Sequence, residues 1–166
     1  MNDKKNTDLD KIDLGHGIEI GFFNISSEST PAEIDLQLAT TVLLFEVVKS
    51  DGHIDRNEVA RVIEILRERF SLHADQVGRL LELVSDDGAQ SPTLHDFTDK
   101  IRAHWGNNKR LELLENFWVI AIADKIIDHR ETELIERIAN LLNLNDTDIT
   151  AARQKAQKRL ESAPTR

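Results

Sequence analysis

Two short acidic segments carry the residues of this chain that are best suited to chemistry. One begins at Asp51 and ends at Glu58, and the other begins at Asp124 and ends at Glu131. Both read Asp-x-x-Ile-Asp-x-x-Glu, so each places carboxylates at its first, fifth and eighth positions. Calcium and magnesium prefer oxygen ligands of this kind. The repeated carboxylates are therefore candidate ligands of a divalent metal ion: Asp51, Asp55, Glu58, Asp124, Asp128 and Glu131.

Helix capping explains part of this pattern without a metal. The aspartate at the fifth position of each segment can cap the helix that follows, and the glutamate at the eighth position can complete a capping box. The helix dipole also favours acidic side chains in a first turn. Asp51 and Asp124 differ, because each lies at the C-terminal end of an apolar helix, where the dipole disfavours an anion. The position of these two aspartates therefore indicates that a cation lies nearby.

A metal site in these segments would not be an EF-hand. That loop needs an oxygen ligand at its third position, glycine at its sixth and glutamate at its twelfth, whereas the first segment has His53, Arg56 and Val62 there. Backbone carbonyls, such as those of His53 and Ile126, would have to complete a different design, with calcium as the favoured ion. His53 and His129 occupy different positions in the two segments, so we interpret them first as surface residues. As ligands they would make zinc or another transition metal the alternative.

The composition of the 166 residues excludes several classes of protein. A net charge of −9 and a pI near 5.1 argue against nucleic-acid binding, which requires a basic surface. The absence of Cys excludes disulfides, thiolate metal sites and cysteine catalysis. The sequence shows no secretory signal and no apolar run long enough for a membrane span. We therefore expect a soluble, cytoplasmic protein.

Helical periodicity dominates the rest of the chain. There are only seven Gly and three Pro, and apolar residues recur at three- and four-residue steps. This pattern predicts an all-α fold of about seven helices, in which two related three-helix halves are joined by a spacer helix. The predicted helices cover approximately residues 31–49, 55–70, 74–85, 92–105, 109–123, 128–142 and 145–160.

Capping residues mark the predicted helix starts. Thr30 precedes Pro31 at the first helix, so that a capping residue is followed by proline at the first helical position. Ser91 and Pro92 offer the same combination for the spacer helix. Asn145 is the expected cap of the last helix.

The predicted domain boundaries follow from these helices. Residues 30–163 form the helical domain, with one repeat at about 31–86, the spacer helix at about 92–105 and the second repeat at about 108–163. Residues 1–29 form an amino-terminal extension that is partly disordered. Its apolar side chains either dock on the domain or bind a partner: Ile18, Ile20, Phe22 and Phe23.

At the acidic segments the sequence resembles the tellurite-resistance TerB-like family. The resemblance rests on a long apolar helix, the motif Asp-Gly-x-Ile-x-x-x-Glu and an amphipathic helix, followed by a Leu-led entry into the next helix. The matching residues lie at 47–58 and 72–77, and the second half repeats the pattern at 121–131 and 144–149. The resemblance extends over most of the chain, from about residue 31 to 163.

This resemblance implies both a fold and a site. It implies an all-helical domain in two related halves. It also implies a metal-binding role, within bacterial stress and tellurite-resistance systems, for the two acidic segments, which are here called the acidic junctions because each joins two helices. By position, the implied ligands are Asp51 and Glu58, then Asp124 and Glu131, with the aspartates between them as less certain members. Lys125 departs from the glycine of the family motif, which makes the first junction the better candidate.

The leading prediction is therefore a non-enzymatic domain that binds a divalent ion and protein partners. An enzyme would need more than carboxylates such as Glu58 and Glu131 as general bases, and the sequence has no nucleophile motif, phosphate-binding glycine loop or cofactor fingerprint. The alternative is a helical protein–protein adaptor in which the acidic junctions are only helix caps.

The C-terminal helix is the main basic feature of this acidic chain. We interpret it first as a solvated helix whose cations favour the C-terminal end of the dipole. Contact with an acidic partner or an anionic lipid is the weaker alternative. The basic residues are Arg153, Lys155, Lys158, Arg159 and Arg166.

Overall fold

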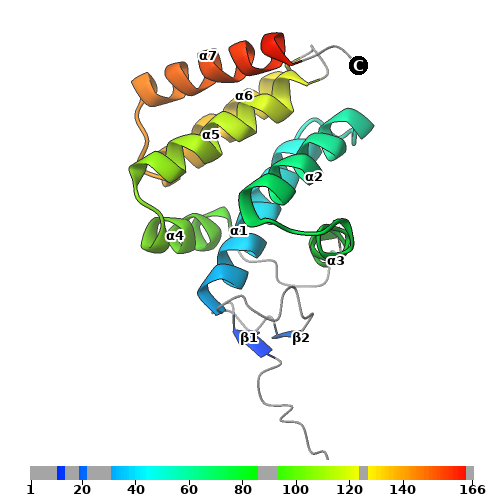
Figure 1. The fold of residues 1–166 in the computed structure, drawn as a ribbon. Coiled ribbons are helices and arrows are strands. Elements are labelled where there is room, and N and C mark those ends of the chain that lie inside the picture. The colour runs from blue at the N-terminus through cyan, green and yellow to red at the C-terminus, as the bar shows by residue number, and fades with distance from the viewer. Residues whose placement is uncertain (1–10, 14–18, 22–30, 86–92, 124–126, 164–166) are drawn as a thin grey trace, which may run out of the picture.

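The computed structural model describes residues 11–13, 19–21, 31–85, 93–123 and 127–163. These residues form seven helices and a small two-stranded sheet (Figure 1). The prediction of an all-α fold with about seven helices is confirmed. The helices are α1 (Pro31–Lys49), α2 (Arg56–Phe70), α3 (Ala74–Ser85), α4 (Leu94–His104), α5 (Asn107–Ile122), α6 (His129–Leu141) and α7 (Asp146–Ser162).

The two strands form a short hairpin in the amino-terminal extension. β1 (Lys11–Asp13) pairs antiparallel with β2 (Glu19–Gly21), and Ile12 lies opposite Ile20. The sequence analysis did not predict this pairing. Ile18, Phe22 and Phe23 lie outside the described residues, so the docking of this apolar patch stays a prediction.

Two helices form the centre of the molecule. α1 contacts α2, α3, α4, α5 and α6, while α5 contacts α1, α2, α6 and α7. Apolar residues cover most of the circumference of both helices, as helices with neighbours on several sides require. Leu43 and Leu44 of α1, like Phe117 and Ile120 of α5, are fully buried. Figure 1 shows α7 lying along α5, whereas α3 packs against α1 and α2.

The start of α4 differs from the prediction. Thr93, not Ser91, is the N-cap, and the helix begins at Leu94. Thr93 Oγ1 accepts a hydrogen bond from the Asp96 backbone N–H (3.4 Å), and the Asp96 carboxylate accepts one from the Thr93 N–H (2.8 Å). Ser91 has Leu94 three residues later, which cannot return such a bond. The complete capping box therefore lies two residues after the predicted start.

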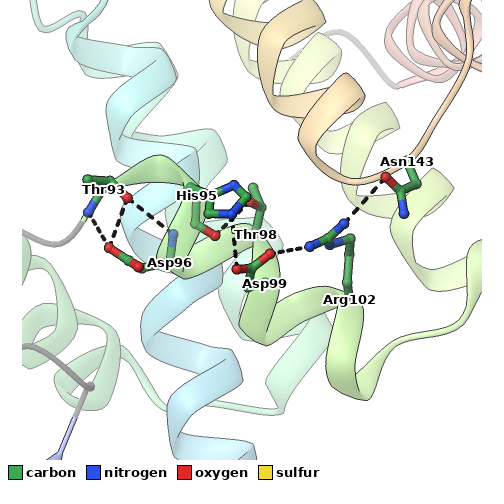
Figure 2. A network of polar contacts seen from close by, with 7 residues as sticks. All are labelled: Thr93, His95, Asp96, Thr98, Asp99, Arg102 and Asn143. Carbon is green, nitrogen blue, oxygen red and sulfur yellow. Dashed lines mark hydrogen bonds and ion pairs between the residues drawn. The ribbon is translucent and has the colours of Figure 1, made fainter.

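A polar network joins α4 to the turn between α6 and α7 (Figure 2). Asp99 of α4 pairs with His95 (3.3 Å) on one side and with Arg102 on the other. Arg102 also donates a hydrogen bond to Asn143 Oδ1 (3.4 Å). The spacer helix is thus attached to the second half of the chain by side chains as well as by its packing.

The ends of α2 and α6 share an uncommon backbone conformation. Ser71 and Asn143 have φ values of 54° and 57°, in a region that residues other than glycine seldom adopt. Each is followed by a buried leucine, Leu72 or Leu144, which anchors the turn into the next helix. These matched positions favour the division of the chain into two related halves, which stays a prediction.

Both tryptophans are covered by arginines. The Arg69 guanidinium lies 4.3 Å from the ring centroid of Trp105, which also stacks on Phe70 at 6.1 Å. The Arg153 guanidinium lies 5.0 Å from the ring centroid of Trp118. Because arginine over an aromatic ring is favourable, these contacts help to attach α2 to the end of α4 and α7 to α5.

Candidate functional site

The first acidic junction begins with a tight turn after α1. The Gly52 N–H donates to the Lys49 carbonyl (3.0 Å), and Gly52 has a φ of 84°, which favours glycine. Asp51 Oδ1 then accepts a hydrogen bond from the His53 N–H (2.7 Å). No described residue makes a hydrogen bond to the second oxygen, Oδ2. The turn therefore fixes the half-buried Asp51 carboxylate at the C-terminal end of α1.

The start of α2 uses the other two carboxylates of this junction. Asp55 is the N-cap, as predicted, and its Oδ1 accepts a hydrogen bond from the Asn57 N–H (2.6 Å). Glu58 follows in the first turn and is only 1% exposed. Ile54 lies between the turn and Asp55, and it is 60% exposed. The junction thus combines a solvent-facing tip with a carboxyl group that is removed from water.

The second acidic junction repeats the cap and the buried glutamate. Asp128 caps α6, and its Oδ1 accepts a hydrogen bond from the Arg130 N–H (2.7 Å). Glu131 Oε2 accepts one from the Asp128 N–H (3.0 Å), so the predicted capping box is present. Glu131 is 1% exposed, as Glu58 is. Asp124 lies outside the described residues.

The described part of the chain does not hold the predicted ligands in a preformed cluster. No three His, Asp or Glu side chains of the described residues, among them Asp51, Asp55 and Glu58, lie close enough together to bind one metal ion. Their carboxylates belong to a turn, a helix cap and the core respectively. A cation at this junction would therefore have to draw them together, and the ligand set stays a prediction.

The histidines of the two junctions are exposed. His53 contributes its backbone N–H to the Asp51 turn. His129 Nε2 lies 3.1 Å from Glu133 Oε1, one turn along α6, and both side chains are well exposed. These positions agree with the interpretation of both histidines as surface residues.

Comparison with known proteins decides the family. The family model described as Tellurite resistance protein TerB matches residues 37–154, which extend from α1 into α7. The chain belongs to the TerB family. Both acidic junctions lie within the matched residues of this TerB domain. No curated protein and no solved structure matches the chain.

Among the described residues, none of the helices combines the length and the apolar character that crossing a bilayer demands.

A second group of polar residues in the TerB domain lies outside the acidic junctions and was not predicted. A cavity of about 230 Å³ lies between α2, α5 and α7. Arg159 of α7 reaches across it to Asn116 Oδ1 (2.9 Å) and to Glu68 Oε2 (3.3 Å). Glu115 and Asn116 are neighbours on α5, but nothing in the sequence pattern places Arg159 beside them.

Arg69 closes another side of this cavity. Its guanidinium donates hydrogen bonds to Glu112 Oε2 (3.1 Å) and to the Lys109 carbonyl (3.0 Å). Burial lowers the pKa of Arg69, and the hydrogen bond and charge of Glu112 oppose this effect. The ion pair thus offsets part of the cost of placing a cation between helices.

The basic α7 helix is less available than its sequence suggests. Arg159 is used in the cavity, and Arg153 lies over Trp118. Lys155 and Lys158 are exposed, and Arg166 lies outside the described residues. Part of the positive charge that an anionic partner would need is therefore already engaged by the TerB domain itself.

Proposed function

We propose that this TerB-family protein is a non-enzymatic helical domain that binds a divalent cation, with calcium favoured, at its acidic junctions. The observation that carries the proposal is the repetition of a capping aspartate and a glutamate that is 1% exposed at matching positions of the two junctions. Carboxylate oxygens are the ligands that calcium and magnesium prefer.

Asp51 supports the same proposal at the first junction. It lies next to the C-terminal end of α1, where the helix dipole disfavours an anion, and its turn holds the carboxylate in place. The donors at this junction are carboxylate and backbone carbonyl oxygens, which suit a hard cation. Asp51, Asp55 and Glu58 would be the side-chain ligands, with Asp124, Asp128 and Glu131 as the second set.

The match to the TerB family supports a biological setting. We propose that the domain acts in a bacterial stress or tellurite-resistance response, in the cytoplasm and through protein partners. In such a role, ion binding would change the stability or shape of the junction that a partner contacts. Catalysis would not be required.

Thermal unfolding with and without ions tests this function. The protein is measured with excess chelator and then with millimolar calcium, magnesium or zinc. Ion at about one hundred times its dissociation constant should stabilise the fold by about 2.7 kcal/mol. Asp51→Ala and Glu58→Gln should remove most of the shift, whereas the exposed residue Asp146 gives a matched control, Asp146→Ala, that should retain it.

A helical adaptor whose acidic residues act only as caps is the second candidate. The complete capping box of Asp128 and Glu131 favours it, because it gives both carboxylates a structural role. This candidate predicts that no ion changes the unfolding temperature. It also predicts that Asp55→Ala costs about 1 kcal/mol with or without ion. The absence of a shift with all three ions would contradict metal binding.

A further inference from the structure

The three described aspartates of the acidic junctions fold back on their own backbone in the same way. Oδ1 of Asp51 accepts a hydrogen bond from the N–H two residues later at 2.7 Å, and Asp55 and Asp128 accept the equivalent bonds at 2.6 and 2.7 Å. Each bond closes a ring that contains the side-chain carboxyl carbon, Cγ, and the backbone nitrogen of the next residue. Each turn therefore keeps a carboxyl carbon beside a backbone nitrogen that can attack it.

Asp51 alone of these three aspartates is followed by glycine. Gly52 is exposed, has no side chain to shield its backbone nitrogen, and would place an added Cβ with no atom within 4 Å. The other two aspartates are followed by Arg56 and His129, whose nitrogens belong to the first turns of α2 and α6. Access to the next backbone nitrogen thus distinguishes Asp51 from the other two.

Two hydrogen bonds hold the Asp51–Gly52 peptide in its closed conformation. The Gly52 N–H donates to the Lys49 carbonyl (3.0 Å), and the His53 N–H donates to Asp51 Oδ1 (2.7 Å). Packing adds little, because Gly52 and His53 are exposed and Ile54 is 60% exposed. A segment with so few contacts opens locally while the rest of a domain stays folded.

We propose that Asp51 is a site of spontaneous isoaspartate formation, which proceeds when this turn opens. The Gly52 nitrogen attacks Asp51 Cγ, a C–N bond forms, and one carboxyl oxygen leaves as water with the amide proton and a proton from solvent. Water then opens the resulting succinimide ring and returns a proton to solvent. Addition at Cγ restores aspartate, whereas addition at the backbone carbonyl carbon of Asp51 breaks the original peptide bond.

The second product changes the first junction permanently. The chain then runs through Cβ and Cγ of Asp51, so the turn is longer by one methylene group, and a carboxylate replaces the original backbone carbonyl. The hydrogen bonds of Gly52 and His53 depend on the original spacing and are lost. The converted turn therefore stays open, and refolding does not restore it.

Peptide mapping of the full chain in water labelled with heavy oxygen tests this site. The protein is kept for several weeks at neutral pH and physiological temperature, with chelator so that ion binding does not contribute, and is then digested with trypsin in ordinary water. We expect residues 50–56 to give a second peptide that is separated by chromatography and carries heavy oxygen. Electron-transfer fragmentation, which marks the position of isoaspartate, should assign it to Asp51.

The same digest contains the matched controls. Asp55 lies in the same peptide, and Asp128 lies in residues 126–130, so both are measured beside Asp51 and should stay unmodified. The other Asp-Gly pair, Asp87–Gly88, lies outside the described residues and falls in a separate peptide. Asp51→Glu keeps a carboxylate but requires a larger ring, and should give no labelled isomer of residues 50–56.

Two comparisons test the control by the turn. Guanidinium chloride unfolds the chain and removes both hydrogen bonds, so conversion of Asp51 should be at least about tenfold slower in the folded than in the unfolded chain. Thr93→Ala destabilises the domain at α4, away from this turn, and should leave the folded rate unchanged. A reaction that required global unfolding would instead become about fivefold faster in Thr93→Ala.

Four results would overturn the proposal. They are the absence of isoaspartate at Asp51 in the folded chain, equal conversion of Asp55 or Asp128, a labelled isomer of residues 50–56 in Asp51→Glu, and equal rates in the folded and unfolded chain. The fivefold rise in Thr93→Ala would overturn local opening of the turn. Because chelator is present throughout, each of these results is independent of the metal experiment.

Discussion

Gly52 sets the direction of the chain at the first acidic junction. Its φ of 84° is strained for any residue with a side chain, although an added Cβ would have no atom within 4 Å. The strain is therefore conformational and not steric. We expect Gly52→Ala to lower the free energy of unfolding by about 1 kcal/mol or more in urea denaturation.

Gly78 provides the opposite case with the same substitution. It lies in α3 with normal helical backbone, is exposed, and likewise has no atom near an added Cβ. Gly78→Ala should raise the free energy of unfolding by about 0.5–1 kcal/mol, because alanine favours the helix. Equal changes in the two variants would contradict the role given to the Gly52 backbone.

Residue-scale features were predictable where they depend on neighbouring residues alone. Asp55, Asp128 and Asn145 were predicted as caps, and all three are. The prediction of Ser91 as the cap of α4 was wrong, because Thr93 forms a complete capping box two residues later. The burial of Glu58 could not be predicted, since it depends on which helices pack over the first turn of α2.

At the scale of an element, the capping box of α4 is the feature most open to a test. Thr93→Ala removes the side-chain acceptor and leaves the Asp96 backbone N–H without this bond. The expected loss is about 1 kcal/mol in urea denaturation. Ser91→Ala is the control and should change the stability little. A larger loss for Ser91→Ala would restore the original prediction of the helix start.

Contacts between elements that are far apart in the sequence were the least predictable. Helix positions could be read from periodicity and caps, and the predicted ranges match all seven helices closely. The group of polar residues between α2, α5 and α7 could not be predicted, because Arg159 and Glu68 are separated by 91 positions and meet only after α7 packs along α5. A single sequence gives no information about such pairing.

At the scale of the whole molecule, α4 is one of several elements that join the two predicted halves, beside the contacts of α1 with α5 and α6 and of α2 with α5. It contacts both α1 and α6, and its Ile101 is fully buried. Ile101→Ala should therefore lower the free energy of unfolding by about 2–5 kcal/mol. Leu160→Ala, near the end of α7 and only half-buried, should cost less.

Calorimetry of the same variants tests the coupling directly. If α4 joins the halves into one cooperative unit, the calorimetric and van't Hoff enthalpies should agree in the unaltered protein and in Ile101→Ala. Two resolved transitions in the unaltered protein would show instead that the halves unfold separately. The shared contacts of α4 lead us to expect a single transition.

The pairing of each tryptophan with an arginine has an optical consequence. The chain has two Trp and no Tyr, so its intrinsic fluorescence comes essentially from two rings. Trp105 reports on the contact of α2 with the end of α4, and Trp118 reports on the contact of α7 with α5. Proteins with a single Trp→Phe replacement would therefore emit separate signals for two different interhelical contacts, without any added label.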